Sequence, residues 1–262
     1  MNDDPLGALV ARSVGGDVSN VRAEELPPEG TVERKRLHFT RDGRTTTALF
    51  ERSAPGPATE AQLLPFLARK TEHVPRVYSR GIPPPHTPRG PWLLLEDVAD
   101  RASACGSDPV AIVRAKLAIE RAVAGDGPAL RALGVPSLTP GELVSRVAPR
   151  ILDERRVIGA AVSAERLSSW PIALVHGDLQ CVRTAMTERG VVVSAWRHAY
   201  LGCALLDLAR LCADLRTHGR GASADAAAAL YVAEATGAEG NERLRDADIV
   251  DALLREASAT YN

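Results

Sequence analysis

The chain is poor in lysine and has no excess of either charge. Its 32 basic residues are almost all arginine, and its 33 acidic residues bring the formal net charge to −1; the lysines are Lys35, Lys70 and Lys116. This balance lacks the electrostatic attraction on which binding to nucleic acid or to an acidic membrane surface depends. We therefore expect neither partner. The preference for arginine, together with abundant alanine, is typical of a GC-rich bacterial genome.

Paired cysteines and long apolar segments are also lacking. The cysteines form no CxxC pair, so their spacing does not predict a zinc site and favours reduced thiols; they are Cys105, Cys181, Cys203 and Cys212. No apolar stretch approaches the ~20 residues of a membrane span. The acidic N-terminus lacks the basic and apolar regions of a signal peptide. These features together favour a cytoplasmic protein.

The composition is that of a globular protein with an ample core, since 45% of the 262 residues are hydrophobic and 25% are charged. The length exceeds that of a usual single domain, which predicts either one large domain or two lobes.

The first part of the chain is predicted to be a small β-rich unit. Thr31–Phe39 and Thr45–Arg52 read as strands, and the Asp42-Gly43 dipeptide between them favours a tight hairpin turn. A helix is expected to open near Thr59. Two further strands are expected at Val77–Ser79 and Trp92–Glu96.

The remainder of the chain has mainly helical periodicity. Five helical segments are expected, at Asp108–Ala124, Gly141–Ile158, Leu205–Leu215, Ala222–Thr236 and Arg243–Ala259. The predicted fold class is therefore α+β.

One segment, residues 173–211, carries the most specific pattern. An apolar strand, Ile172–Val175, precedes a His176-Gly177-Asp178 loop, and a short helix-like stretch and an Arg-Gly turn lead to a second strand at Val191–Ser194. A Leu-rich helix follows. This layout resembles the catalytic core of the aminoglycoside phosphotransferase and choline kinase-like family, whose members are relatives of the protein kinases.

The resemblance implies a two-lobed, protein-kinase-like fold. Residues 1–97 would form the N-lobe, a small antiparallel β-sheet with one helix. Residues 98–262 would form a larger and mainly helical C-lobe that contains the catalytic-loop-like segment 173–211.

The resemblance also implies a catalytic arrangement that this chain keeps only in part. In such kinases a loop Asp accepts the proton of the substrate hydroxyl, and an Asn five residues later holds magnesium together with an Asp at the end of the next strand. Asp178 matches the first position, whereas Arg183 and Ala195 stand at the other two. Arginine is a permanent cation without an acceptor atom, and alanine offers no ligand. The candidate catalytic residues are therefore Asp178 as a remnant base, Arg183 and His176, with no metal ligand.

The nucleotide-binding features are also incomplete. The strand Thr45–Arg52 contains no lysine, so Arg52 is the candidate phosphate contact, and Glu60 is its expected helical partner. Glu96 and Val98 would belong to the hinge that meets adenine in the family. The sequence has no Gly-rich phosphate loop. Magnesium is therefore not expected, and the binding of ATP is left open.

Three functions remain open at this point. The first is a pseudokinase that serves as a binding or scaffolding subunit for a partner enzyme or a peptide, as a homo- or hetero-oligomer. The second is a lyase or anion-binding enzyme in which Arg183, with Arg197, forms an anion cradle beside the base Asp178. The third is a divergent phosphotransferase that holds its metal through other residues.

Overall fold

A computed structural model describes residues 5–54, 59–84, 89–98, 101–235 and 240–259 of the chain. The chain divides into two compact units, residues 1–101 and residues 102–262, and each unit is described by itself. Within the described ranges, no helix is both long enough and apolar enough to cross a membrane.

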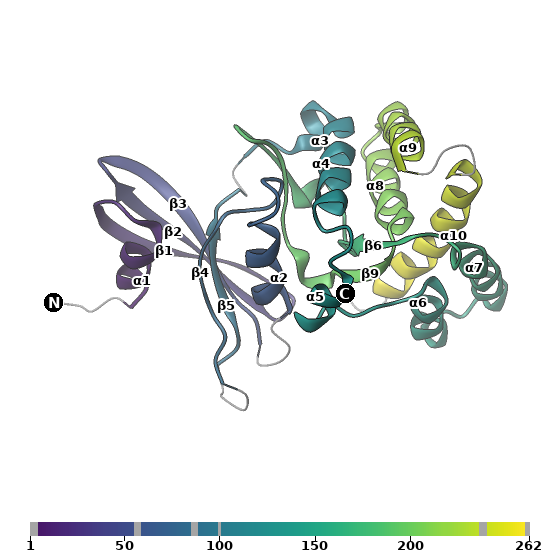
Figure 1. Ribbon diagram of the computed structural model, residues 1–262, viewed down its shortest axis with the longest axis horizontal. Coiled ribbons are helices and arrows are strands. Elements are labelled where there is room, and N and C mark those ends of the chain that lie inside the picture. Colours follow the sequence, from purple (N-terminus) through teal and green to yellow (C-terminus); the bar gives the residue numbers. More distant parts are fainter. Residues whose placement is uncertain (1–4, 55–58, 85–88, 99–100, 236–239, 260–262) are drawn as a thin grey trace. The chain divides into compact units, whose positions relative to one another are not determined.

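The first unit is built on a five-stranded sheet with the strand order β1-β2-β3-β5-β4, in which every neighbouring pair is antiparallel (Figure 1). The strands are β1 (Val18–Glu29), β2 (Val32–Arg41), β3 (Arg44–Arg52), β4 (Val77–Gly81) and β5 (Trp92–Glu96). Two helices accompany them, α1 (Pro5–Val14) and α2 (Thr59–Leu67). The predicted strands and helix are confirmed, whereas α1 and β1 were not predicted.

The β2–β3 hairpin follows directly from its turn residues. Asp42 and Gly43 both have positive φ, 48° and 76°, which is the backbone that a two-residue type I′ turn requires. The Asp42 carboxylate accepts a hydrogen bond from the backbone N–H of Asp17 at 3.0 Å, so the turn is also tied to the start of β1. Alternate residues of the hairpin, among them Leu37 and Phe50, are buried against α1.

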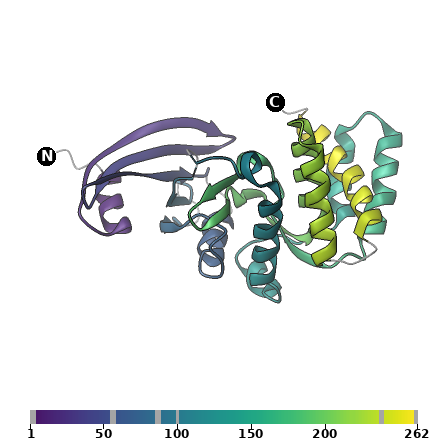
Figure 2. The same ribbon diagram turned by 90° about the horizontal axis from the view of Figure 1, so that it is seen from above.

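The second unit is mainly helical. Its helices are α3 (Ala104–Ser107), α4 (Pro109–Ala122), α5 (Gly127–Ala132), α6 (Pro140–Val147), α7 (Glu154–Leu167), α8 (Leu205–Thr217), α9 (Gly221–Ala235) and α10 (Gly240–Ala259). Helix α10 packs against α7 and α8, and α9 packs against α4 and α8 (Figure 2). The Ala-rich face of α9 permits this close approach, since Ala224 and Ala227 are fully buried.

One predicted helix is wrong. The segment Gly141–Ile158 is not continuous, because α6 passes into a 3-10 turn, Ala148–Arg150, that contains Pro149. A new helix, α7, begins after Asp153, whose carboxylate accepts hydrogen bonds from the backbone N–H groups of the first helical residues.

Two short antiparallel ladders support the loop that carries the sequence motif. Strand β6 (Ile172–Val175) pairs with β9 (Tyr200–Cys203), and β7 (Thr184–Thr187) pairs with β8 (Gly190–Val193). The prediction of β6 and of the second strand is confirmed, while the stretch read as helix-like forms β7 after a single 3-10 turn, and β9 was not predicted. The architecture confirms the α+β class, with an antiparallel sheet in the first unit and a larger helical second unit.

Candidate functional site

The loop after β6 is fixed by one carboxylate of α8. The Asp207 carboxylate accepts hydrogen bonds from the backbone N–H of His176 at 2.6 Å and of Gly177 at 2.9 Å. Gly177 has φ 83°, and a Cβ there would lie 2.3 Å from the carbonyl oxygen of His198. Only glycine therefore fits this backbone, and the loop conformation is tightly defined.

Asp207 is itself a buried charge with a buried partner. Lys116 Nζ lies 3.1 Å from its carboxylate and also donates to the carbonyl oxygen of Leu174 at 2.9 Å. Burial alone would lower the pKa of Lys116, but Glu120 and Asp207 outweigh it, so the net shift of the pKa is upward. The ammonium therefore stays charged and compensates the carboxylate that holds the loop.

His176 has a supporting position in this loop. Its Nδ1 accepts a hydrogen bond from the backbone N–H of Asp178 at 3.2 Å, so its Nε2 carries the proton and donates to the carbonyl oxygen of Ser194 at 2.8 Å. The residue is fully buried, and burial lowers the pKa of its imidazole. His176 is therefore neutral and joins the loop to the end of β8.

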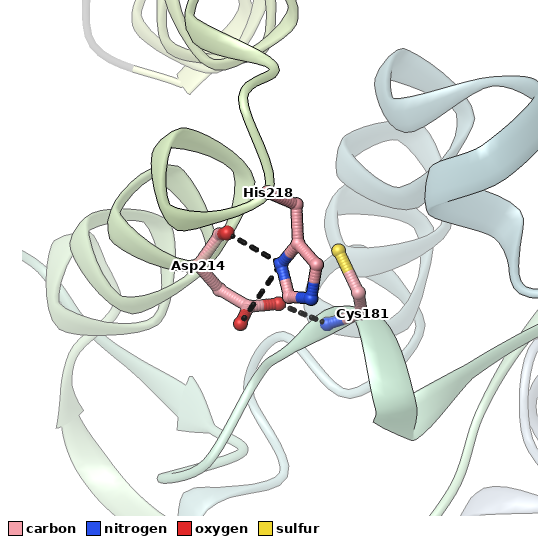
Figure 3. Close-up of side chains that lie close together, drawn as sticks. All are labelled: Cys181, Asp214 and His218. Atoms are coloured by element: carbon pink, nitrogen blue, oxygen red, sulfur yellow. Dashed lines mark hydrogen bonds and ion pairs between the residues drawn. The ribbon is translucent and has the colours of Figure 1, made fainter.

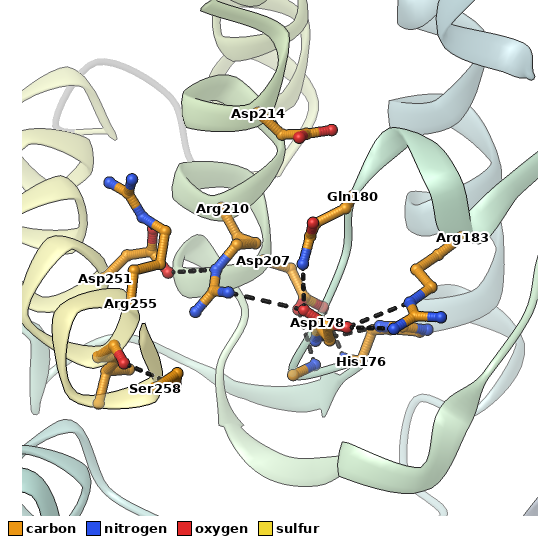
Figure 4. Close-up of polar contacts among 12 residues, drawn as sticks. His176, Asp178, Gln180, Arg183, Asp207, Arg210, Asp214, Asp251, Arg255 and Ser258 are labelled. Carbon is orange, nitrogen blue, oxygen red and sulfur yellow. Dashed lines mark hydrogen bonds and ion pairs between the residues drawn. The ribbon is translucent and has the colours of Figure 1, made fainter. Parts of the chain in front are cut away.

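The carboxylate of Asp178 lies between two guanidinium groups (Figure 4). Arg183 contacts Oδ2 through Nε at 3.1 Å and through Nη2 at 3.0 Å. Arg210 Nη1 lies 3.6 Å from Oδ1, and the amide of Gln180 donates to the same oxygen. The side chains of Asp178 and both arginines are mostly buried. Both carboxylate oxygens are thus engaged by protein groups.

The charged cluster continues along α8 and α10. Arg210 Nε lies 2.7 Å from Oδ1 of Asp251, and Arg255 Nε lies 2.7 Å from Oδ2 of the same carboxylate. The cluster of Asp178, Arg183, Arg210, Asp251 and Arg255 therefore contains three guanidiniums and two carboxylates. We call it the Asp178 cluster.

The sequence predicted Asp178 and Arg183 together with His176, and the structure brings these three residues into one loop. Sequence reasoning missed Arg210 and Arg255, and it named Arg197 as the second arginine. The second guanidinium on Asp178 belongs to Arg210, whereas Arg197 lies in the 3-10 turn Trp196–His198.

A signal for Arg210 exists in the sequence. Asp207, Arg210 and Asp214 recur at helical spacing on one face of the mostly apolar α8. These three side chains contact successive parts of the loop. Asp207 accepts from the backbone N–H groups of His176 and Gly177, and Arg210 faces Asp178. Asp214 Oδ2 accepts from the backbone N–H of Cys181 at 2.7 Å.

The residues at the expected magnesium position do not fit that ion. Magnesium requires hard oxygen ligands, preferably carboxylates. Asp178 is held by two cations, Arg183 has no acceptor atom, and Ala195 has no side-chain oxygen. Ala195 nevertheless has φ 63° and ψ 61°, a left-handed conformation that is rare outside Gly, Asn and Asp. The backbone at this position therefore suits an Asp better than the Ala it carries.

The four predicted nucleotide contacts lie in the first unit. Arg52 on β3 pairs with Glu33 at 3.4 Å and lies over the ring of Phe50. Glu60 is buried in the first turn of α2.

At the end of β5, the carboxylate of Glu96 accepts from the backbone N–H of Arg76 at 3.2 Å. Val98 follows and is buried. The neighbouring Asp97 is held by Arg36 at 2.7 Å.

The expectation of four reduced thiols is wrong for two cysteines. Cys105 in α3 and Cys181 in the loop form a disulfide between residues 76 positions apart, with their Cα atoms 5.4 Å apart. Cys203 and Cys212 are free and buried. The disulfide was missed because a pairing this distant in sequence has no local pattern.

Comparison with known proteins shows the fold. No protein-family model and no curated protein matches the sequence. Among solved structures, a choline/ethanolamine kinase family protein from Mesorhizobium loti is 15% identical, with a TM-score of 0.65 over 100% of this chain and 86% of its own. An aminoglycoside-3′-phosphotransferase of type VIII is 21% identical, with a TM-score of 0.59 over 96% of this chain and 98% of its own.

A third neighbour, a choline kinase from Cryptosporidium parvum, is 9% identical, with a TM-score of 0.61 over 98% of this chain and 88% of its own. The chain therefore has the kinase-like fold that aminoglycoside phosphotransferases and choline kinases share. The fold predicted from the His176-Gly177-Asp178 segment is confirmed.

Proposed function

We propose that this chain, which has the fold of the aminoglycoside phosphotransferases and choline kinases, is a degenerate member of that family. In this proposal it is a pseudokinase that has lost magnesium-dependent phosphoryl transfer and serves as a binding or scaffolding subunit for a partner enzyme or peptide. The observation that carries the proposal is the position of Asp178 between Arg183 and Arg210.

The contacts of Asp178 argue against a role as a general base. A base must present an oxygen lone pair to the hydroxyl whose proton it accepts. Here Arg183 holds Oδ2, while Gln180 and Arg210 face Oδ1. Charge-assisted hydrogen bonds of this kind are among the stronger ones in proteins, so a substrate hydroxyl would have to displace a guanidinium.

The same cations argue against magnesium. Two like charges about 4 Å apart repel by roughly 4 kcal/mol per unit charge at an effective dielectric constant of about 20. A divalent ion beside Arg183 would be repelled in this way. Ala195, at the position where a second carboxylate is expected, offers no negative charge to offset the repulsion. Magnesium-dependent positioning of a nucleotide is therefore disfavoured on two independent grounds.

A second candidate function rests on the excess of positive charge in the Asp178 cluster. Three guanidiniums face two carboxylates, so an anionic ligand could bind without a metal. The engaged state of Asp178 favours anion binding over the lyase alternative, because elimination also needs a base with a free oxygen.

Calorimetric titration with ATP, with and without magnesium, tests the proposal on the wild type and on Arg183→Asn/Ala195→Asp. We expect no magnesium-dependent binding by the wild type and a gain of such binding in the double variant. Magnesium-independent binding that Arg183→Asn abolishes would support the anion site.

Tight magnesium-dependent binding by the wild type would contradict the proposal and favour a divergent active phosphotransferase. Ala185→Gly is the control for a loss of stability alone, because this alanine lies on β7 outside the Asp178 cluster.

A further inference from the structure

The Cys105–Cys181 disulfide lies next to Asp214 and His218, two side chains of the types that can bind metal ions. Among the described residues, a ligand atom from each of Cys181, Asp214 and His218 lies within 4.8 Å of the other two (Figure 3). Cys181 belongs to the loop after β6, whereas Asp214 and His218 come from the C-terminal end of α8. This group is separate from the Asp178 cluster.

His218 is oriented as a metal ligand. Its Nδ1 lies 2.8 Å from the carbonyl oxygen of Asp214, and because a carbonyl only accepts, Nδ1 must carry the proton. The lone pair is therefore on Nε2, which points toward Cys181 in Figure 3. Metal-bound histidines usually donate their second ring N–H to a carbonyl or carboxylate in this way.

The spacing suits a tetrahedral ion after a small adjustment. Zinc bonds of about 2.3 Å to sulfur and about 2.0 Å to nitrogen or oxygen place neighbouring ligand atoms roughly 3.3–3.8 Å apart. The three atoms lie within 4.8 Å of one another and need to approach by at most about 1.5 Å. His218 is 59% exposed and can move, and one oxygen of Asp214 remains anchored by the backbone N–H of Cys181.

Cys105 supplies a fourth ligand of the right kind. Its sulfur is bonded to that of Cys181, so reduction of the disulfide leaves two thiols side by side at the same place. A guanidinium from Arg220 donates to the carbonyl oxygen of Cys105 and fixes the backbone of this residue. Two thiolates, one imidazole and one carboxylate form a donor set that selects zinc over magnesium.

We propose that the reduced chain binds one zinc ion through Cys105, Cys181, Asp214 and His218. A dithiol or phosphine reductant supplies two electrons and breaks the S–S bond, and two protons from solvent give two thiols. Zinc then displaces these two protons and forms two Zn–S bonds. In the reduced chain the metal takes over from the disulfide as the link between α3 and the loop that carries Asp178.

The test uses the full-length protein, reduced with a phosphine, stripped of metal and titrated with zinc against a chromogenic chelator. We expect one zinc ion per reduced chain and none per oxidised chain. His218→Ala should weaken zinc binding at least about tenfold, since even outer contacts of zinc ligands carry such effects. Because His218 is exposed, this variant leaves the fold unchanged. Cobalt substituted for zinc should show thiolate charge-transfer absorption that Cys181→Ser weakens and that Cys105→Ser/Cys181→Ser removes.

Cys203→Ser is the matched control, because this cysteine is a free thiol on β9 outside the group, and it should bind zinc like the wild type. The proposal is overturned if the reduced wild type binds no zinc, if the oxidised protein binds as tightly, or if His218→Ala has no effect. None of these results depends on whether the Asp178 cluster is active.

Discussion

Arg183 contacts a single oxygen of Asp178 through both Nε and Nη2, at 3.1 and 3.0 Å, and the two residues lie only five positions apart. The residue that replaces the expected magnesium ligand is thus also the residue that occupies the expected base. In the proposed function, Arg183 therefore explains two of the expected departures from the kinase pattern, and Ala195, which has a left-handed backbone, is the third.

The backbone of Ala195 leads to a prediction about stability. A left-handed conformation costs a non-glycine residue roughly 1–2 kcal/mol. Glycine does not have this cost, but its greater freedom in the unfolded chain offsets part of the gain in stability. Ala195→Gly should therefore raise the free energy of unfolding by about 0.5–1 kcal/mol, measured by urea denaturation. Ala185→Gly, on the strand β7, should lower it by a similar amount. A loss of stability in Ala195→Gly would contradict this account.

The buried pair of Lys116 and Asp207 predicts a large effect of one substitution. Asp207→Asn removes the charge that faces Lys116 and weakens two backbone hydrogen bonds of the loop. Removal of one partner of a buried pair typically costs about 3–5 kcal/mol, and the remaining Glu120 should reduce the loss to the lower end. Guanidinium denaturation of the wild type and of Asp207→Asn measures this loss in the free energy of unfolding.

The exposed pair of Arg216 and Asp225 supplies the control for that measurement, since Asp225→Asn should cost well under about 1 kcal/mol. Equal effects of Asp207→Asn and Asp225→Asn would show that the buried pair does not hold the loop.

His176 predicts a pH dependence of stability. Burial lowers its pKa below the ordinary value of 6.5, so below pH 6.5 the unfolded chain binds a proton that the folded chain does not. The contribution of His176 is fully present above pH 6.5 and is lost as the pH falls toward the lowered folded-state pKa. The free energy of unfolding should fall by up to about 1.4 kcal/mol per pH unit in this window. An NMR titration of the His176 imidazole checks the assignment, and a midpoint at or above 6.5 would refute it.

Local sequence signals predicted the parts of the fold that local chemistry determines. The Asp42-Gly43 turn fixes the β2–β3 hairpin. The apolar residues of α8 are spaced so that a helix places them together on a buried face. Strand β9 was missed because Tyr200–Cys203 becomes a strand only by pairing with β6.

In the candidate site, too, contacts between residues close in sequence were predicted and contacts between distant residues were missed. Asp178 and Arg183 belong to one loop and were predicted together, whereas Arg210 reaches Asp178 from a separate helix. The Cys105–Cys181 disulfide joins residues 76 positions apart. Contacts of this range depend on the packing of whole elements, and a single sequence does not record that packing.

The decisive measurement is the formation of ADP from ATP in the presence of magnesium and candidate hydroxyl acceptors, compared between the wild type and Asp178→Asn. Our expectation is that the two proteins are indistinguishable from each other and from buffer, because the Asp178 carboxylate is held by Arg183 and Arg210. Magnesium-dependent turnover by the wild type that Asp178→Asn abolishes would contradict it and would make Asp178 a working catalytic base.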